Sequence, residues 1–460
     1  MTANLSCPVS VLLAAGREEA LRPLLVQLVV IILAARAGAA VARLLRQPSV
    51  VGEIVAGLLL GPSAFGAWFP ELFAAVFRAG PGTGGSLEAS LASFSQIGLV
   101  LLLFLIGIEF DFSHVRRQGG LAAGISLAGI VVPFGLGCGL ALVMAPRLER
   151  LGATGPLDPR AFALFMGTAM SITAIPILGR ILIEMGLQHT PLGAIVVAAA
   201  ACDDAVGWTL LAAVSALATG DFEAGRIAGM VAATLAFAAA CLFVVRPLLL
   251  PALERSVRDD EPGRPGPRLP LGMLSTILAV LLVAAWVTSR IGVFAIFGGF
   301  LLGASLSGVP RVREAVAAHL ADFVTVFFLP IFFTFTGLRT QVGALATPEA
   351  AAWCAAVFAV AVVGKWGGCG LAARLSGLPA GEAACVGVLM NTRALMELIV
   401  VNVGMDLGVI PPAVYTMLVL MAIGTTLMAT PLATRLLRGS PYEPTLVARG
   451  FLGPGMNLRP

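Results

Sequence analysis

The sequence predicts an all-α polytopic membrane protein. Its 460 residues are 58% hydrophobic and 12% charged, with a mean hydropathy of +0.98. A typical soluble domain carries about 25% charged residues. Apolar runs of about 20 residues, the length that crosses the hydrocarbon core, follow one another along the chain. We therefore expect about thirteen transmembrane helices, and this composition excludes a soluble enzyme.

The thirteen spans are separated by short polar or charged connections. They are predicted at 22–45, 49–66, 92–110, 120–145, 160–186, 190–218, 225–251, 270–289, 291–308, 320–339, 350–373, 380–404 and 411–434. We expect no cleavable signal peptide, because the segment up to Arg22 carries Glu18 and Glu19 and lacks a small-residue cleavage site.

The basic residues predict the orientation of the chain. Apart from Lys365 and Arg393, the N-terminal tail and the even-numbered connections carry nine arginines, and the other connections and the C-terminal tail carry eighteen. The positive-inside rule assigns the excess to the cytoplasm. We therefore expect a multi-pass protein of the cell inner (plasma) membrane, with its N-terminus outside and its C-terminus in the cytoplasm.

A polar, Pro/Gly-rich linker at 254–268 follows the seventh span and leaves six spans on each side of it. This arrangement predicts two inverted six-helix repeats, and transporters built in this way bind substrate at discontinuous helices in matching positions. We expect a first repeat at 1–218, a linking span and linker at 219–269, a second repeat at 270–438 and a short cytoplasmic tail at 439–460.

The fifth span of each half carries polar residues at its centre. These are Ser171, Thr173 and Pro176 in the first half, and Asn391, Thr392 and Arg393 in the second. A proline removes an amide and clashes with the preceding helical turn. Such kinks are common in membrane helices, but their matching positions favour a transporter with two crossed discontinuous helices.

Two adjacent aspartates, Asp203 and Asp204, stand near the middle of the apolar sixth span. An ionised side chain at the bilayer centre costs about 2.5–3.5 kcal/mol or more, so such residues usually mark ion or proton pathways. Adjacent helical residues point about 100° apart, so one carboxylate can meet a neighbouring helix while the other faces a cavity. A purely structural pair that holds helices together is the alternative.

Lys365 is the only lysine in a chain with 28 arginines, and it lies inside an apolar span. A lysine buried without a counter-charge loses its proton, because desolvation disfavours the charged form. A carboxylate beside it, such as Asp203, can keep it charged. Arginine stays charged in nearly any setting, so we interpret the choice of lysine as a need to release a proton.

Other charged residues predict structural roles. Arg393 and Glu397 are four residues apart and can pair along one helix face, and Arg393 could also cap the carbonyls of a half-helix. Glu53 and Glu109 stand near span ends, where a solvated or interfacial position is expected. The seven cysteines form no CxxC pair, which argues against a zinc site, and the scattered arginines indicate no nucleic-acid partner.

Six motifs, taken in order, resemble the monovalent cation:proton antiporter family, which includes NapA-type sodium/proton antiporters, Kef-type potassium efflux systems and plant cation/proton exchangers. The motifs are RQPSVVGEIVAGLLLGPSAFG, LLLFLIGIEFD, SITAIPILGRIL, ACDDAVGW, PIFFTFTGLRT and NTRALMELIV. The resemblance covers nearly the whole chain. It implies a homodimer without cofactors, in which a core domain (spans 4–6 and 11–13) moves against a dimerisation domain (spans 1–3 and 8–10).

The resemblance also implies residue roles. Asp204 would carry the ion and Asp203 would pair with Lys365, the two aspartates together forming the monovalent-cation site. Thr173 and neighbouring carbonyls would line the first broken helix. The family's glycine after the Asn-Thr-Arg motif is Ala394 here, from which we expect a tighter second break. In a second departure, we expect no nucleotide-binding domain of the Kef type after the last span.

The expected function is therefore exchange of Na⁺, and also Li⁺, for protons across the lipid bilayer. Two protons for one cation would make this exchange electrogenic. A K⁺/H⁺ antiporter of the potassium-efflux type is the main alternative, although the paired aspartates with a lysine favour sodium. An ion channel is a further alternative, and it would differ from an antiporter in needing no alternating access. An intramembrane aspartyl protease is disfavoured, because such an enzyme needs two carboxylates from separate elements, whereas Asp203 and Asp204 are adjacent on one helix.

Overall fold

The computed structural model describes residues 9–45, 47–77, 84–109, 119–147, 157–188, 190–218, 224–257, 267–292, 294–393 and 395–452. All elements in these residues are helices, so the predicted all-α class is confirmed. The helices are α1 (Val9–Leu44), α2 (Ser49–Leu59), α3 (Phe65–Trp68), α4 (Pro70–Phe77), α5 (Gly84–Glu109), α7 (Gly119–Met144), α8 (Pro159–Ser171), α9 (Ile175–Met185), α10 (Pro191–Ala218), α11 (Ala224–Ala240), α12 (Arg246–Ser256), α13 (Leu271–Ile291), α14 (Ala295–Leu306), α15 (Pro310–Phe323), α16 (Leu329–Arg339), α17 (Pro348–Val362), α18 (Gly368–Leu375), α19 (Ala380–Met390), α20 (Leu395–Asp406), α21 (Pro412–Leu436) and α22 (Glu443–Ala448).

Ten helical stretches in the described residues are long and apolar enough to cross a membrane. The other three predicted spans correspond to the short apolar helices α2 and α14 and to the interrupted pair α8 and α9. The thirteen crossings and the boundaries of the two repeats stay predictions.

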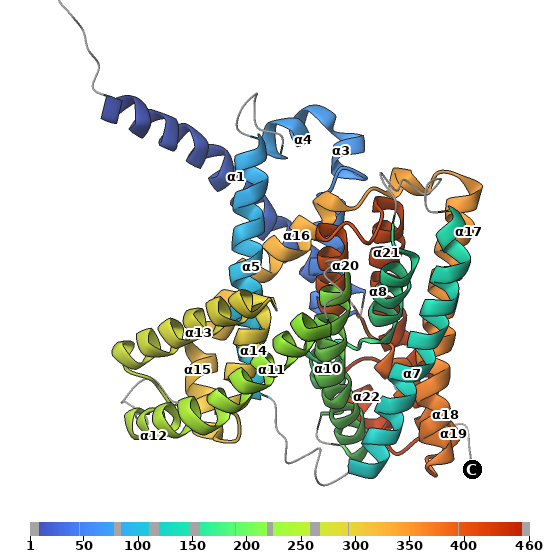
Figure 1. The fold of residues 1–460 in the computed structure, drawn as a ribbon. Helices are drawn as coiled ribbons and strands as arrows, with labels where there is room; N and C mark the ends of the chain where they lie inside the picture. The colour runs from blue at the N-terminus through green and yellow to red at the C-terminus, as the bar shows by residue number, and fades with distance from the viewer. Residues whose placement is uncertain are drawn as a thin grey trace, which may run out of the picture.

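The helices pack into two groups (Figure 1). The scaffold group contains α1, α2, α5 and α11–α16, and the site group contains α7–α10 and α17–α21. Helices of the site group such as α7, α17 and α19 lie at the right of the figure, and α12, α13 and α15 of the scaffold group lie at the left. The two groups meet where α2 packs against α21.

Backbone contacts at glycines hold α2 between two scaffold helices. A Cβ placed on Gly52 would lie 2.0 Å from the Gly38 carbonyl oxygen of α1. On the α16 side, a Cβ placed on Gly337 would lie 2.1 Å from the Gly57 carbonyl oxygen. Small residues let membrane helices approach this closely, so the position of α2 depends on both crossings.

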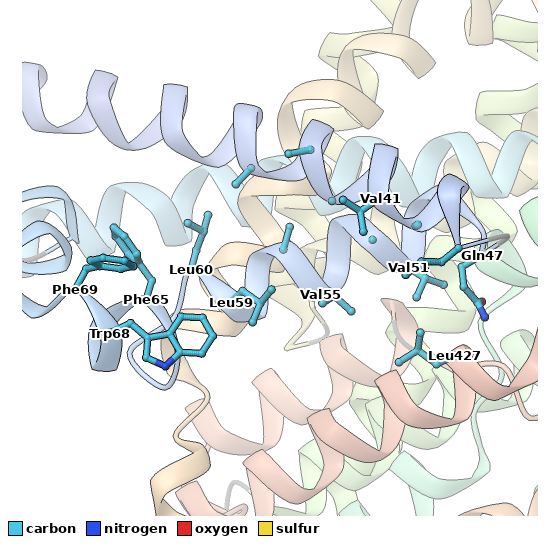
Figure 2. A pocket seen from close by; sticks show the side chains of 17 residues that line it. Val41, Gln47, Val51, Val55, Leu59, Leu60, Phe65, Trp68, Phe69 and Leu427 are labelled. Carbon is cyan, nitrogen blue, oxygen red and sulfur yellow. The ribbon is translucent and has the colours of Figure 1, made fainter.

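An apolar groove of about 620 Å³ runs beside the α1–α2 crossing (Figure 2). Figure 2 shows Leu427 of α21 across the groove from Val51 and Gln47. Among the described residues that line the groove, none has a charged side chain, and the polar groups are the Gln47 amide and the Trp68 indole nitrogen. The groove is therefore separate from the charged residues that the sequence predicts for the ion site.

Polar contacts also join the two groups at two places. Arg180 of α9 donates to the Ser49 hydroxyl of α2, with 2.5 Å between nitrogen and oxygen. Arg339, the last residue of α16, donates to Asn402 Oδ1 at 3.0 Å and to Asp406 Oδ1 at 2.5 Å, both on α20. A sliding movement of one group along the other would have to break these contacts.

Glu53 is buried, so the expectation of a solvated or interfacial position was wrong for this residue. Its Oε1 atom lies 2.7 Å from Arg36 Nη2 of α1, and the Glu53 side chain is 0% exposed. The reason is tertiary, because α2 is enclosed by α1, α16 and α21. Glu109 is exposed, as expected.

Gly52→Ala should lower the melting temperature of the purified protein, because its methyl group would push α1 and α2 apart. Overpacking of this kind costs about 1–3 kcal/mol. Gly124→Ala in α7 is the matched control, since a Cβ there meets no atom within 4 Å. Equal melting temperatures for the two variants would contradict the backbone contact between α1 and α2.

Candidate functional site

Two helices of the site group are interrupted where the sequence predicts discontinuous helices. Helix α8 ends at Ser171 and α9 begins at Ile175, while α19 ends at Met390 and α20 begins at Leu395. The backbone amide of Ala174 donates to the Thr392 carbonyl at 3.2 Å, so the two breaks touch each other.

Local chemistry explains the first break. Pro176 lies in the first turn of α9, where its missing amide leaves no helical hydrogen bond unmade. The proline therefore begins the second half-helix. The second break has Asn391 as the C-terminal cap of α19, and the Thr392 hydroxyl donates to the Leu389 carbonyl at 2.8 Å. Ala394, the departure from the family motif, lies outside the described residues.

Asp203 of α10 receives hydrogen bonds from three elements. Its Oδ2 atom lies 2.5 Å from Lys365 Nζ and 2.8 Å from Thr173 Oγ1, and its Oδ1 atom lies 2.6 Å from Ser126 Oγ. Asp203, Lys365 and Thr173 are all 0% exposed. The structure thus brings together the three residues that the sequence placed at this point and adds Ser126.

Lys365 lies in a π-helical turn, Val363–Gly367, between α17 and α18. Single π-turns within α-helices often occur at functional sites. The ammonium group donates to Asp203, to the Gly129 carbonyl at 2.8 Å and to the Ser171 carbonyl. All three ammonium protons therefore have an acceptor, which a charged lysine needs when it is fully buried.

Asp204 differs from Asp203 in its hydrogen bonding. It is 0% exposed, and neither of its carboxylate oxygens has a hydrogen-bond partner among the described residues. A buried carboxylate without a partner is costly, so a proton or a bound cation is required to compensate its charge. This is the one carboxylate of the adjacent pair that is available to a ligand.

Arg393 crosses from the second break to the first. Its Nη1 atom donates to the Ala169 carbonyl at 2.9 Å and its Nη2 atom to the Met170 carbonyl at 2.6 Å. Nη1 also lies 3.4 Å from Glu397 Oε2, and Nε lies 3.4 Å from Asn391 Oδ1. Both structural roles predicted for Arg393, pairing with Glu397 and capping a half-helix, are present.

The end of α8 is neutralised by two cations. The last carbonyls of a helix have no partner within it and carry the negative end of the helix dipole. Here Arg393 takes the carbonyls of Ala169 and Met170, and Lys365 takes that of Ser171. The half-helix can therefore end inside the membrane without unsatisfied carbonyls at these three positions.

Sequence reasoning missed Ser126 and Gly129, both on α7. A Cβ on Gly129 would lie 2.5 Å from Cys369 Sγ, which is too close, and 3.6 Å from Lys365 Nζ, which is an ordinary contact, so glycine at this position leaves room for Cys369. Small residues are frequent in membrane helices. Their presence in α7 therefore carried no signal that distinguished these two.

Residues 29–439 match the family described as sodium/hydrogen exchanger, transmembrane. The chain is 38% identical over 393 residues to the Na⁺/H⁺ antiporter NhaS4 of Synechocystis sp., which covers 85% of this chain and 91% of that protein. It is 35% identical over 415 residues to cation/H⁺ antiporter 17 of Arabidopsis thaliana, covering 90% of this chain and 48% of the relative. The chain thus spans about half the length of this plant protein.

Two further likenesses concern a yeast protein and a solved structure. K⁺/H⁺ antiporter 1 of Saccharomyces cerevisiae is 30% identical over 390 residues, covering 85% of this chain and 43% of the yeast protein. The structure of the sodium proton antiporter MjNhaP1 from Methanocaldococcus jannaschii at pH 8 aligns with a TM-score of 0.53 at 15% identity. It covers 94% of this chain and 100% of that one, which supports the fold.

Arg393→Met should strongly destabilise the protein, because it leaves Glu397 and two carbonyls of α8 buried without their partner. Removing one member of a buried ion pair costs about 3–5 kcal/mol. Arg374→Met is the control, since Arg374 is exposed and donates to the nearby Leu378 carbonyl. Thermal unfolding in detergent measures the melting temperatures of both variants. Similar melting temperatures would show that Arg393 does not hold the crossing together.

Proposed function

We propose that this chain, which belongs to the sodium/hydrogen exchanger family, is a secondary antiporter that exchanges Na⁺ for protons at Asp204. The observation that carries the proposal is the asymmetry of the two aspartates. Asp203 accepts hydrogen bonds from Lys365, Thr173 and Ser126, whereas both oxygens of Asp204 are buried without a partner in the part of the chain that the structure describes. The Asp203 carboxylate is therefore held by hydrogen bonds within the protein, and the Asp204 carboxylate can bind the substrate ion.

The balance of buried charge explains why one ligand must replace the other. Two cationic side chains, Lys365 and Arg393, are buried around the crossed breaks with three carboxylates, Asp203, Asp204 and Glu397. If all five are ionised, one negative charge is left over, and a buried excess charge is unfavourable. Either a proton or a monovalent cation on Asp204 removes it. Binding of one therefore displaces the other, which is the requirement for exchange.

Lys365 supplies a second proton in this proposal. We infer that a cation bound at Asp204 disturbs the neighbouring Lys365–Asp203 pair and favours release of the Lys365 proton. The cation-loaded site is then one charge more negative than the proton-loaded site. Asp203 then keeps its hydrogen bonds from Thr173 and Ser126. Two protons for one cation moves one net charge, so the membrane potential contributes about 2.3 kcal/mol per 100 mV to each cycle.

Access from the two sides would alternate by movement of the site group against the scaffold group. The site group contains the helices expected for the core domain, and the scaffold group those expected for a dimerisation domain. In the predicted orientation, the Arg180–Ser49 contact is cytoplasmic and the Arg339–Asp406 contact is external. Each would form and break as the site turns from one side of the plasma membrane to the other. The scaffold group would form the homodimer.

Exchange of K⁺ for protons is the second candidate. It is favoured by the 30% identity to a yeast protein named as a K⁺/H⁺ antiporter. Na⁺ and K⁺ sites use the same oxygens and differ in cavity dimensions, so the proposed site at Asp204 serves either ion. Proteoliposomes with an imposed pH gradient, tested with Li⁺, Na⁺ and K⁺ in turn, would identify the substrate.

Asp204→Asn should abolish exchange while the protein still folds, because the amide keeps the volume of the side chain and removes its charge. The control is Asp322→Asn on α15, an exposed position. Dequenching of a pH-sensitive dye in proteoliposomes measures exchange for both. In the wild type, the apparent KM for the cation should rise as the pH falls, because protons compete for Asp204. Exchange by the Asn variant, or a pH-independent KM, would place the ion elsewhere.

A further inference from the structure

We propose that Ser126 sets the cation affinity of the site by keeping Asp203 out of the coordination of the cation. This inference rests on the proposed exchange at Asp204. Ser126 is 3% exposed and lies on α7. The sequence pattern that indicates the other site residues does not indicate Ser126. It is a positioning residue, because it acts on the substrate through Asp203.

The two oxygens of Asp203 are held in different ways. Oδ2 has two donors, Lys365 and Thr173, and keeps one of them if the other is lost. Oδ1 has one donor among the described residues, the Ser126 hydroxyl at 2.6 Å. Among the described residues, Ser126 therefore decides whether Oδ1 of Asp203 is occupied by a proton donor or is left as a bare anionic oxygen.

The direction of the Ser126 hydroxyl is itself informative. Serine and threonine in membrane helices commonly donate to the carbonyl four residues earlier in their own helix. Thr168, Thr234 and Ser275 do so here. Ser126 instead donates to a charged side chain on another helix, which gives a shorter and stronger bond. Its role is therefore tied to Asp203 more than to the stability of α7.

A cation bound at Asp204 and the Ser126 hydroxyl would compete for Oδ1 of Asp203. With the hydroxyl in place, the cation has the Asp204 carboxylate as its only charged ligand. Without it, Oδ1 of Asp203 can turn to the cation as a second charged ligand, and the cation is held more tightly. Tighter binding of the ground state does not help the transport step, so turnover should fall.

The test compares Ser126→Ala with Ser126→Thr, which keeps the hydroxyl. We expect Ser126→Ala to lower the apparent KM for Na⁺ or K⁺ about two- to twelvefold, the effect of a hydrogen bond worth about 0.5–1.5 kcal/mol, and to lower kcat. Ser126→Thr should stay close to wild type. Ser215→Ala on α10 is the matched control, because the Ser215 hydroxyl is buried and has no hydrogen-bond partner among the described residues.

A second measurement reports binding without transport. The rise in melting temperature with increasing NaCl or KCl, at constant ionic strength with choline, should occur at lower salt in Ser126→Ala than in wild type. An unchanged KM and an unchanged salt midpoint would overturn the proposal, even if the variant melts earlier. A raised KM would also overturn it, because Ser126 would then assist binding directly.

The outcome is separable from that of the proposed function. If Asp204→Asn exchanges cations as well as wild type does, the ion site is elsewhere and both proposals fail. If Asp204→Asn is inactive and Ser126→Ala has the KM of Ser215→Ala, only the role of Ser126 is wrong.

Discussion

The buried ion pair between Lys365 and Asp203 is the contact on which the crossed helices and the free carboxylate depend. Through Lys365 the π-turn is tied to α10, to the end of α8 and to the Gly129 carbonyl of α7. A buried pair is tolerated only when its remaining hydrogen-bonding groups are satisfied. Here every ammonium proton and both carboxylate oxygens have partners, so the pair meets this condition and holds α10 in place at Asp203.

The second cation supports the same arrangement from the other break. Arg393 reaches the last turn of α8, while the amide of Ala174 bonds to Thr392, so each break fixes the other. A membrane helix can be interrupted only where the freed backbone groups find partners in the protein. In this chain the partners at the end of α8 are the two basic side chains buried at the crossing. Among the carboxylates at the crossing, Asp204 is the one for which no described residue supplies a hydrogen bond, and this is why we propose it as the ion-binding group.

Much of this arrangement can be predicted from the sequence, because polar residues within apolar spans are conspicuous. Asp203, Asp204, Lys365 and Arg393 stand out for this reason, and Pro176 indicates where a half-helix begins. Ser126 could not be recognised in this way, since its partner is 77 residues away and serine is ordinary in a membrane helix. The burial of Glu53 was missed because it depends on the enclosure of α2 by three other helices, which no local pattern records.

The most direct test of the account concerns Lys365 as a proton carrier. Lys365→Gln leaves Asp203 a hydrogen-bond donor but removes the titratable ammonium, so exchange that survives should carry less net charge. Proteoliposome exchange would be measured with and without an imposed membrane potential, set by potassium diffusion only if K⁺ is not a substrate. We expect the exchange rate of wild type to respond to the membrane potential and that of an active Lys365→Gln variant to respond much less. An active variant that responds as strongly as wild type would show that Lys365 is a structural counter-charge.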